Sequence, residues 1–148
     1  MRRSFVAIVF SATVMIGACS SLIEDEFSGW TLVKAHQTTK NDPLFSSFGL
    51  VSYKVYLNTL LAEDINSNTP KKIGSKAAIV VYPIDGLSMQ KPTLTGFLEK
   101  TKNNSGQSVW KISAVDGNGK PLADETVKGA CMSCHLQMDD RVLLGQYK

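Results

Sequence analysis

A five-residue stretch near the C-terminus, Cys131-Met132-Ser133-Cys134-His135, carries the most specific chemistry in the sequence. Cysteines three positions apart share one face of a helical turn, so both sulfurs can form thioether bonds to the vinyl groups of one porphyrin. The adjacent histidine can then place a ring nitrogen on the iron as the proximal axial ligand. The spacing therefore predicts one covalent haem c, attached through Cys131 and Cys134 and ligated by His135.

Three other uses of the paired cysteines fit the sequence less well. A thioredoxin-like redox pair follows a strand of a βαβ unit, and no such pattern precedes Cys131. A zinc site would need a fourth ligand, for which His36 is the obvious candidate, and zinc ligands usually come from two paired clusters. A disulfide across two intervening residues would close a loop too small to add much stability.

The late position of the motif bears on the second axial site of the iron. Only 13 of the 148 residues follow His135. Met138 lies three residues further on and, on one helix, would share the proximal side of the ring. Unless His36, Met89 or a lysine folds over from upstream, the sixth position is open or holds water. An open iron binds or transforms small molecules, whereas an iron with two protein ligands mainly transfers electrons.

The N-terminal residues have the layout of an export signal. A positive start precedes an apolar run from Phe5 to Ala18, which is too short for an ordinary membrane-spanning helix. The small residues before Cys19 resemble the lipobox of bacterial lipoproteins, which implies cleavage before Cys19 and lipid attached to it. We therefore expect residues 1–18 to be a signal peptide and residues 19–29 to be a lipidated tether.

Composition and charge suit one exported domain, residues 30–148. With 43% hydrophobic and 20% charged residues, the chain can bury a single core. Without Arg2 and Arg3, 14 of the 16 basic residues remain against 13 acidic ones, and this balance gives no reason to expect nucleic-acid binding. We expect the domain on the periplasmic side of a bacterial envelope, lipid-anchored, or soluble in the periplasm if Cys19 is not lipidated.

The middle of the chain predicts strands, not the long helices of a four-helix cytochrome. Residues 51–58 alternate, with Val51, Tyr53, Val55 and Leu57 on one face. Residues 77–82 form a continuous apolar run, typical of a buried strand, and residues 108–115 alternate again. Weaker strand candidates are residues 30–36 and 93–101, and turn signals lie at 85–86, 103–106 and 116–119. We expect a mainly β, antiparallel domain whose C-terminal helix, from about Asp124 to Met138, bears the haem.

These features resemble the cytochrome P-460 and cytochrome c′-β family over roughly residues 30–147. The matching stretches are residues 53–58, Gly74-Ser75 before a hydrophobic strand, the strand of Trp110, the haem motif, and Asp139-Asp140 with Val142 in the tail. The resemblance implies a mainly antiparallel β domain that carries haem c near its C-terminus.

The family resemblance implies two functions. Cytochromes P-460 oxidise hydroxylamine, sometimes with nitric oxide, using a haem that is cross-linked to a lysine. Cytochromes c′-β lack the cross-link and bind nitric oxide or carbon monoxide in an apolar distal pocket. In the cross-linked members this lysine lies on the strand after the Gly-Ser turn. Here that strand spans residues 76–82, and Lys76 is its only lysine. A gapless alignment puts an apolar residue at the position of the family's cross-linking lysine. The only arginine after the signal peptide, Arg141, follows the haem motif, whereas catalytic members have a distal arginine and carboxylate.

The leading expectation is a five-coordinate haem iron that binds a small ligand such as nitric oxide. One alternative is a hydroxylamine-oxidising enzyme in which Lys76 is the haem cross-link, and another is a six-coordinate electron carrier that uses His36 or another residue. Candidate distal bases, each also explained as a solvated charge, are Glu63, Asp64, Asp85 and Glu99. Candidate distal caps, each also explained as core, are Phe45, Phe48, Tyr56 and Phe97.

Two kinds of protein partner are also expected. Lysines such as Lys71, Lys72 and Lys76 are interpreted as a solvated patch that could guide an acidic redox partner protein at low salt. An exposed edge strand could pair two copies into a homodimer.

Overall fold

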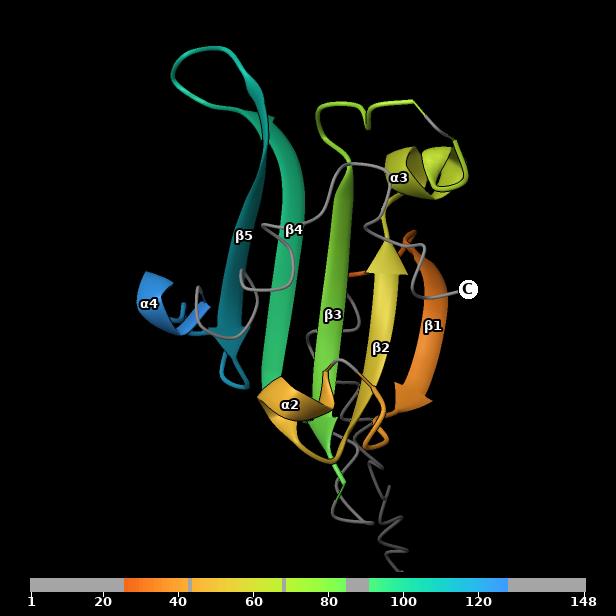
Figure 1. Ribbon diagram of the computed structural model, residues 1–148, viewed down its shortest axis with the longest axis vertical. Coiled ribbons are helices and arrows are strands. Elements are labelled where there is room, and N and C mark those ends of the chain that lie inside the picture. Colours follow the sequence, from red (N-terminus) through yellow and green to blue (C-terminus); the bar gives the residue numbers. More distant parts are fainter. Residues whose placement is uncertain (1–25, 43, 68, 85–90, 128–148) are drawn as a thin grey trace, which may run out of the picture.

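Five β-strands pair in the order in which they occur along the chain, each antiparallel to the next (Figure 1). This computed structural model describes residues 26–42, 44–67, 69–84 and 91–127. The strands are β1 (Thr31–Gln37), β2 (Val51–Leu57), β3 (Lys76–Pro83), β4 (Leu94–Lys102) and β5 (Ser108–Asp116). The prediction of a mainly β domain built on an antiparallel sheet is therefore confirmed.

Short helices accompany the sheet. The helix α2 (Phe45–Phe48) lies between β1 and β2, α3 (Thr59–Asp64) lies between β2 and β3, and α4 (Asp124–Val127) follows β5. The helix expected from Asp124 to Met138 is described only over α4, and the rest of it lies outside the described residues.

One face of the sheet packs against α2 and α3, and we call it the helix face. The four alternating residues of β2 point to this face and are buried there, as the sequence predicted. Leu61 of α3 belongs to the same buried cluster, and Phe48 of α2 packs against it. Each large apolar side chain that is fully buried contributes about 1.5–3 kcal/mol, so this cluster is a main source of stability.

The other face of the sheet carries aromatic side chains, and we call it the aromatic face. Tyr56 of β2 and Phe97 of β4 both lie opposite Ala78 of β3 in the strand register. Phe27 and Trp30, which precede β1, pack over this face. Strand β3 is therefore covered on both faces, which explains why its sequence is a continuous apolar run.

Polar side chains hold the turns that were expected from the sequence. In the β4–β5 hairpin, the Asn103 carboxamide oxygen accepts hydrogen bonds from the backbone N–H groups of Ser105 (3.0 Å) and Gln107 (2.9 Å). Gly106 there has φ of +77°, a conformation that glycine adopts without strain. After β5, the Asp116 carboxylate accepts from the backbone of Asn118 (2.8 Å) and Lys120 (3.0 Å). The predicted turn at residues 85–86 lies outside the described residues.

Candidate functional site

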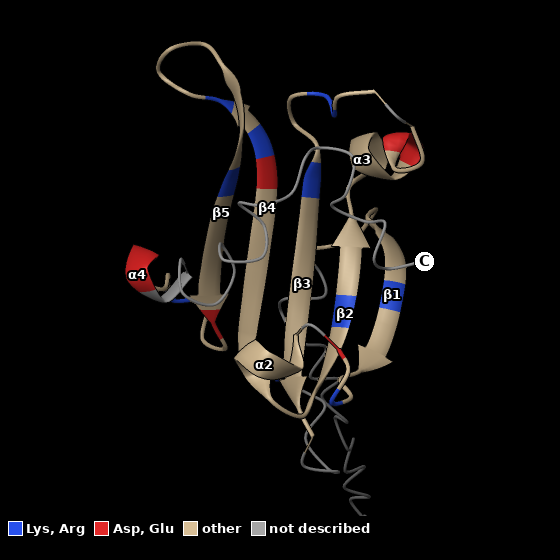
Figure 2. Ribbon diagram, viewed as in Figure 1, with Lys and Arg blue, Asp and Glu red and all other residues tan. Residues whose placement is uncertain are grey.

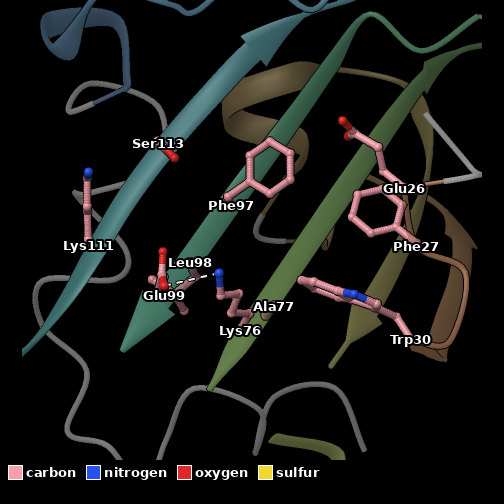
Figure 3. A pocket seen from close by; sticks show the side chains of 10 residues that line it. All are labelled: Glu26, Phe27, Trp30, Lys76, Ala77, Phe97, Leu98, Glu99, Lys111 and Ser113. Atoms are coloured by element: carbon pink, nitrogen blue, oxygen red, sulfur yellow. Dashed lines mark ion pairs between the residues drawn. The ribbon is translucent and has the colours of Figure 1, made fainter. Parts of the chain in front are cut away.

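A pocket of about 430 Å³ opens on the aromatic face (Figure 3). Its floor comes from β3, β4 and β5, and one wall comes from the residues just before β1. This volume lies in the range of ordinary small-molecule and cofactor sites. The residues that line it are Glu26, Phe27, Trp30, Lys76, Ala77, Phe97, Leu98, Glu99, Lys111 and Ser113.

Four aromatic rings form the apolar wall of the pocket and its immediate support. The Phe27 ring stacks on Tyr56, with centroids 4.9 Å apart and planes at 11°. It meets Trp30 edge-on at 5.2 Å and Phe97 at 6.2 Å. Phe27 is only 5% exposed, although it lies in the stretch that was expected to be a tether. The folded core therefore begins before Trp30.

Charged residues form the opposite end of the pocket. Lys76 Nζ lies 3.1 Å from Glu99 Oε1, and both side chains are 43% exposed. In the register of the sheet, Glu99 lies opposite Lys76 on one side and opposite Lys111 on the other. An ion pair this exposed contributes about 1 kcal/mol or less to stability, so its importance lies in where it places charge.

Asn58 fixes the backbone from which Lys76 projects. Its carboxamide oxygen caps α3 by accepting from Leu61 N (3.1 Å), and it also accepts from Lys76 N (3.0 Å). Its Nδ2 donates to the Gly74 carbonyl at 2.9 Å. One side chain thus joins the end of β2, the start of α3 and the start of β3, and holds Lys76 at the pocket rim.

The four candidate distal caps divide between the two faces of the sheet. Tyr56 and Phe97 lie together on the aromatic face, where Phe97 lines the pocket. Phe45 and Phe48 are on α2, and Phe48 packs against the helix-face core. The sheet separates the two pairs, so they cannot cover the same side of one bound group.

His36 is not among the residues that line the pocket. It lies exposed on β1, two strands away from β3, with its ring edge-on to Tyr53 at a centroid distance of 6.1 Å. It borders a separate hollow of about 560 Å³, together with Tyr53, Lys54, Tyr82 and others. The residue considered from the sequence as a fourth zinc ligand or a second axial haem ligand therefore lies apart from the aromatic pocket.

Only one of the described candidate bases reaches the pocket, and that residue is Glu99. Glu63 is exposed on α3, and the Asp64 carboxylate accepts a hydrogen bond from the Ser67 hydroxyl at 2.5 Å. Asp85 lies outside the described residues.

The expected lysine patch is wrong in one member. Lys71 is only 6% exposed, and its ammonium donates to the backbone carbonyls of Asp64 and Ser67, the latter at 3.0 Å. A cation at the C-terminal end of a helix satisfies unpaired carbonyls and interacts favourably with the helix dipole, so Lys71 serves α3. Lys72 is exposed, and Lys76 is paired with Glu99.

The haem motif itself, Cys131 to His135, lies outside the described residues, as do Cys19, Met89, Met138 and Arg141. Within the part of the chain that the structure describes, no cluster of histidine, cysteine and acidic residues could hold a metal ion. Likewise, no described helix has the length and apolar character needed to cross a membrane.

The described chain ends beside β5, which forms one side of the pocket floor. Leu122 N donates to the Ala114 carbonyl at 2.9 Å, which places the segment after β5 alongside the neighbour of the pocket residue Ser113. Helix α4 then packs against β5. Four residue steps separate Val127 from Cys131, a span of at most about 14 Å.

Several pocket residues were missed from the sequence alone. Lys111 and Ser113 alternate with Trp110, Ile112 and Ala114, so the period of the strand already placed them on the opposite face. Phe27 had no such signal, because it precedes the first strand.

The sequence matches no protein-family model, and no curated protein is significantly similar to it.

Proposed function

We propose that this protein is a c-type cytochrome whose single haem packs on the aromatic face and keeps an open iron position for a small ligand such as nitric oxide. The observation that carries the proposal is the aromatic pocket beside the strand that leads to the Cys131–His135 motif. The finer form of the fold, a cytochrome P-460-like domain with a C-terminal haem-bearing helix, is part of the same proposal.

The residues present suit a haem. Cys131 and Cys134 would attach the porphyrin and His135 would ligate its iron, which when bound supplies a site for diatomic ligands. The aromatic wall offers flat apolar surface to a flat apolar ring, and the small side chain of Ser113 lies beside Phe97 in the sheet register and lines the pocket. Cys131 follows Val127 by four residues, so it would lie within about 14 Å of the described end of α4, which neighbours β5.

The lining of the pocket favours an open iron over a doubly ligated one. Among the described residues that line it there is no histidine or methionine. His36, the leading candidate for a six-coordinate electron carrier, borders the other hollow. The aromatic wall of the pocket carries no charge, which suits an uncharged diatomic ligand.

A second function, hydroxylamine oxidation, is favoured by one observation. Lys76 lines the pocket, where its amine could form the haem cross-link, and Glu99 beside it is a carboxylate that could accept protons. Against this role, the Lys76 ammonium is held in an ion pair that a covalent bond would have to break, and the residues of β3 further along this face are the apolar Ala78 and Val80.

Optical spectroscopy of the protein, expressed with haem c maturation, tests the proposal. We expect covalent haem in the wild type, a high-spin ferric spectrum, and a spectral shift when nitric oxide is added. Cys134→Ala should lose most covalent haem, and His135→Ala should change the iron ligation. His36→Ala is the control and should leave the spectrum unchanged.

Other outcomes would select among the alternatives. A strongly red-shifted ferrous Soret band, with haem mass on a peptide containing Lys76, would replace ligand binding by the hydroxylamine-oxidising function. A low-spin spectrum that ignores nitric oxide and changes in His36→Ala would replace it by electron transfer. Absence of covalent haem in the wild type would refute the proposal.

The cellular setting belongs to the same proposal. Lipid on Cys19 would hold the domain at the periplasmic side of the envelope, where haem c is attached. A redox partner protein and a second copy of the chain remain the expected protein partners. Strand β1 ends the sheet, and its register shift between Leu32 and Lys34 limits how far a second β1 could pair along it.

A further inference from the structure

A charged row crosses three neighbouring strands at one end of the aromatic face. Lys76 of β3, Glu99 of β4 and Lys111 of β5 lie directly opposite one another in the sheet register. All three line the pocket, and in Figure 3 the Lys76 and Glu99 side chains point toward one another. The row carries two positive charges and one negative charge.

On β3, β4 and β5 the next rows of the same face carry no charge. Ala78, Phe97 and Ser113 form the first of them, two residues along each strand, or about 7 Å away. Val80, Thr95 and Val115 form the second. Two other charged residues border this face: Lys54 of β2, which lies opposite Val80, and Glu26, which lines the pocket beside Phe27. In Figure 2 the charged bands of β3 and β4 lie toward one end of these strands. The pocket floor thus changes from uncharged to charged within one step of the pleat.

The positive charge in the row is not balanced. Glu99 pairs with Lys76 at 3.1 Å, whereas no described carboxylate lies within ion-pairing distance of Lys111, whose side chain is exposed. An unpaired lysine at the rim of an apolar pocket suits the anionic end of a ligand that is otherwise apolar.

Haem c has this same division. Its macrocycle is flat and apolar, its two propionates lie on one edge, and its thioether bonds lie toward the opposite edge. Helix α4, which leads to the cysteines, lies toward the Asp116 end of β5 in Figure 1, whereas the charged row lies nearer the other end of that strand. A haem bound with its thioether bonds toward the first end would have its propionates toward Lys111.

We infer that Lys111 binds a haem propionate, and that Glu99 keeps Lys76 from competing for it. This inference rests on the proposed haem site. A cation beside a propionate favours its ionised form and lowers the propionate pKa. The same cation favours the reduced haem, which carries one positive charge fewer than the oxidised haem. Lys111 therefore sets both the reduction potential and the pH at which that potential changes.

The test is the reduction potential of the purified, haem-loaded protein, measured as a function of pH. In Lys111→Gln the potential should fall, and its pH-dependent step should move upward by roughly one pH unit. Lys111→Arg should retain the wild-type profile. Glu99→Gln frees Lys76 and should move the step in the opposite direction, which a merely structural role of the row would not produce.

Lys102→Gln is the matched control. Lys102 is exposed and lies on the same strand as Glu99. Its register partner Ser108 places it on the helix face. Lys102→Gln therefore removes the same charge as Lys111→Gln, but on the face away from the pocket. Lys102→Gln should leave the pH of the step in the reduction potential unchanged.

Two failures are distinguishable. Covalent haem in Lys111→Gln with a wild-type pH profile would overturn this inference and leave the proposed function standing. A wild-type protein that carries no covalent haem would overturn both.

Discussion

The packing of Phe27 on the aromatic face makes a sharp prediction about stability. This residue precedes the first strand, yet it is 5% exposed and contacts Tyr56, Trp30 and Phe97. Replacing a buried phenylalanine by alanine typically costs 3–5 kcal/mol. We expect the lower end, about 3 kcal/mol, for Phe27→Ala, because side chains beside the open pocket can move into part of the space that the ring leaves. For a domain of this size that loss lowers the melting temperature by roughly 10 °C.

Urea unfolding followed by far-ultraviolet circular dichroism measures this loss directly. Phe27→Leu should recover most of it, leaving a deficit of about 1 kcal/mol for the lost ring contacts. Leu50→Ala is the control, because Leu50 is 61% exposed and should change stability by less than about 0.5 kcal/mol. A cost below about 1 kcal/mol for Phe27→Ala would refute the conclusion that the core begins before β1.

Three further predictions concern Asp116 and Gly117 in the turn after β5, and Cys19 near the N-terminus. Backbone hydrogen bonds from Lys120 and Asn118 hold the pKa of Asp116 below its ordinary value. The contribution of Asp116 to stability is therefore present above the unfolded-state pKa and is lost as the pH falls through the lower folded-state pKa. Carbon-detected NMR titration should find the lowered pKa in the wild type, and an ordinary value would contradict the turn geometry. Gly117→Ala should lower the free energy of unfolding in urea by about 1–3 kcal/mol, because a Cβ there would lie 2.2 Å from the Pro92 carbonyl oxygen. The control, Ser105→Ala in the exposed β4–β5 turn, should change it little. Equal losses in the two variants would show that the contact at Gly117 relaxes freely. Radiolabelled palmitate should appear on the wild type and be absent from Cys19→Ala, and an unlabelled wild type would reduce Cys19 to part of an ordinary export signal.

Much of the fold follows from local patterns in the sequence. The alternation of Val51, Tyr53, Val55 and Leu57 predicted both a strand and its buried face, because side chains on a strand repeat with a period of two. The uninterrupted apolar run of β3 predicted a buried strand, and the structure covers it on both faces. Turn residues such as Asn103 and Asp116 marked where strands end, because their side chains hydrogen-bond to backbone N–H groups only two to four positions away.

The composition of the pocket depended on contacts between distant residues. Alternation says which residues of one strand share a face, but it does not say which residues of two strands lie opposite one another. The alignment of Lys76, Glu99 and Lys111 therefore required the backbone pairing of β3, β4 and β5.

Contacts between distant residues also distinguish residues that looked equivalent in the sequence. Phe48 and Phe97 were both candidate caps, but the sheet lies between them because α2 packs on the helix face. Lys71 looked like a surface lysine, but the end of α3 offers carbonyl groups that its ammonium satisfies. The Cys131–His135 motif is recognisable from five consecutive residues because the chemistry that it predicts is local. The aromatic pocket, in contrast, is assembled from strands far apart in the chain and exists only once they pair.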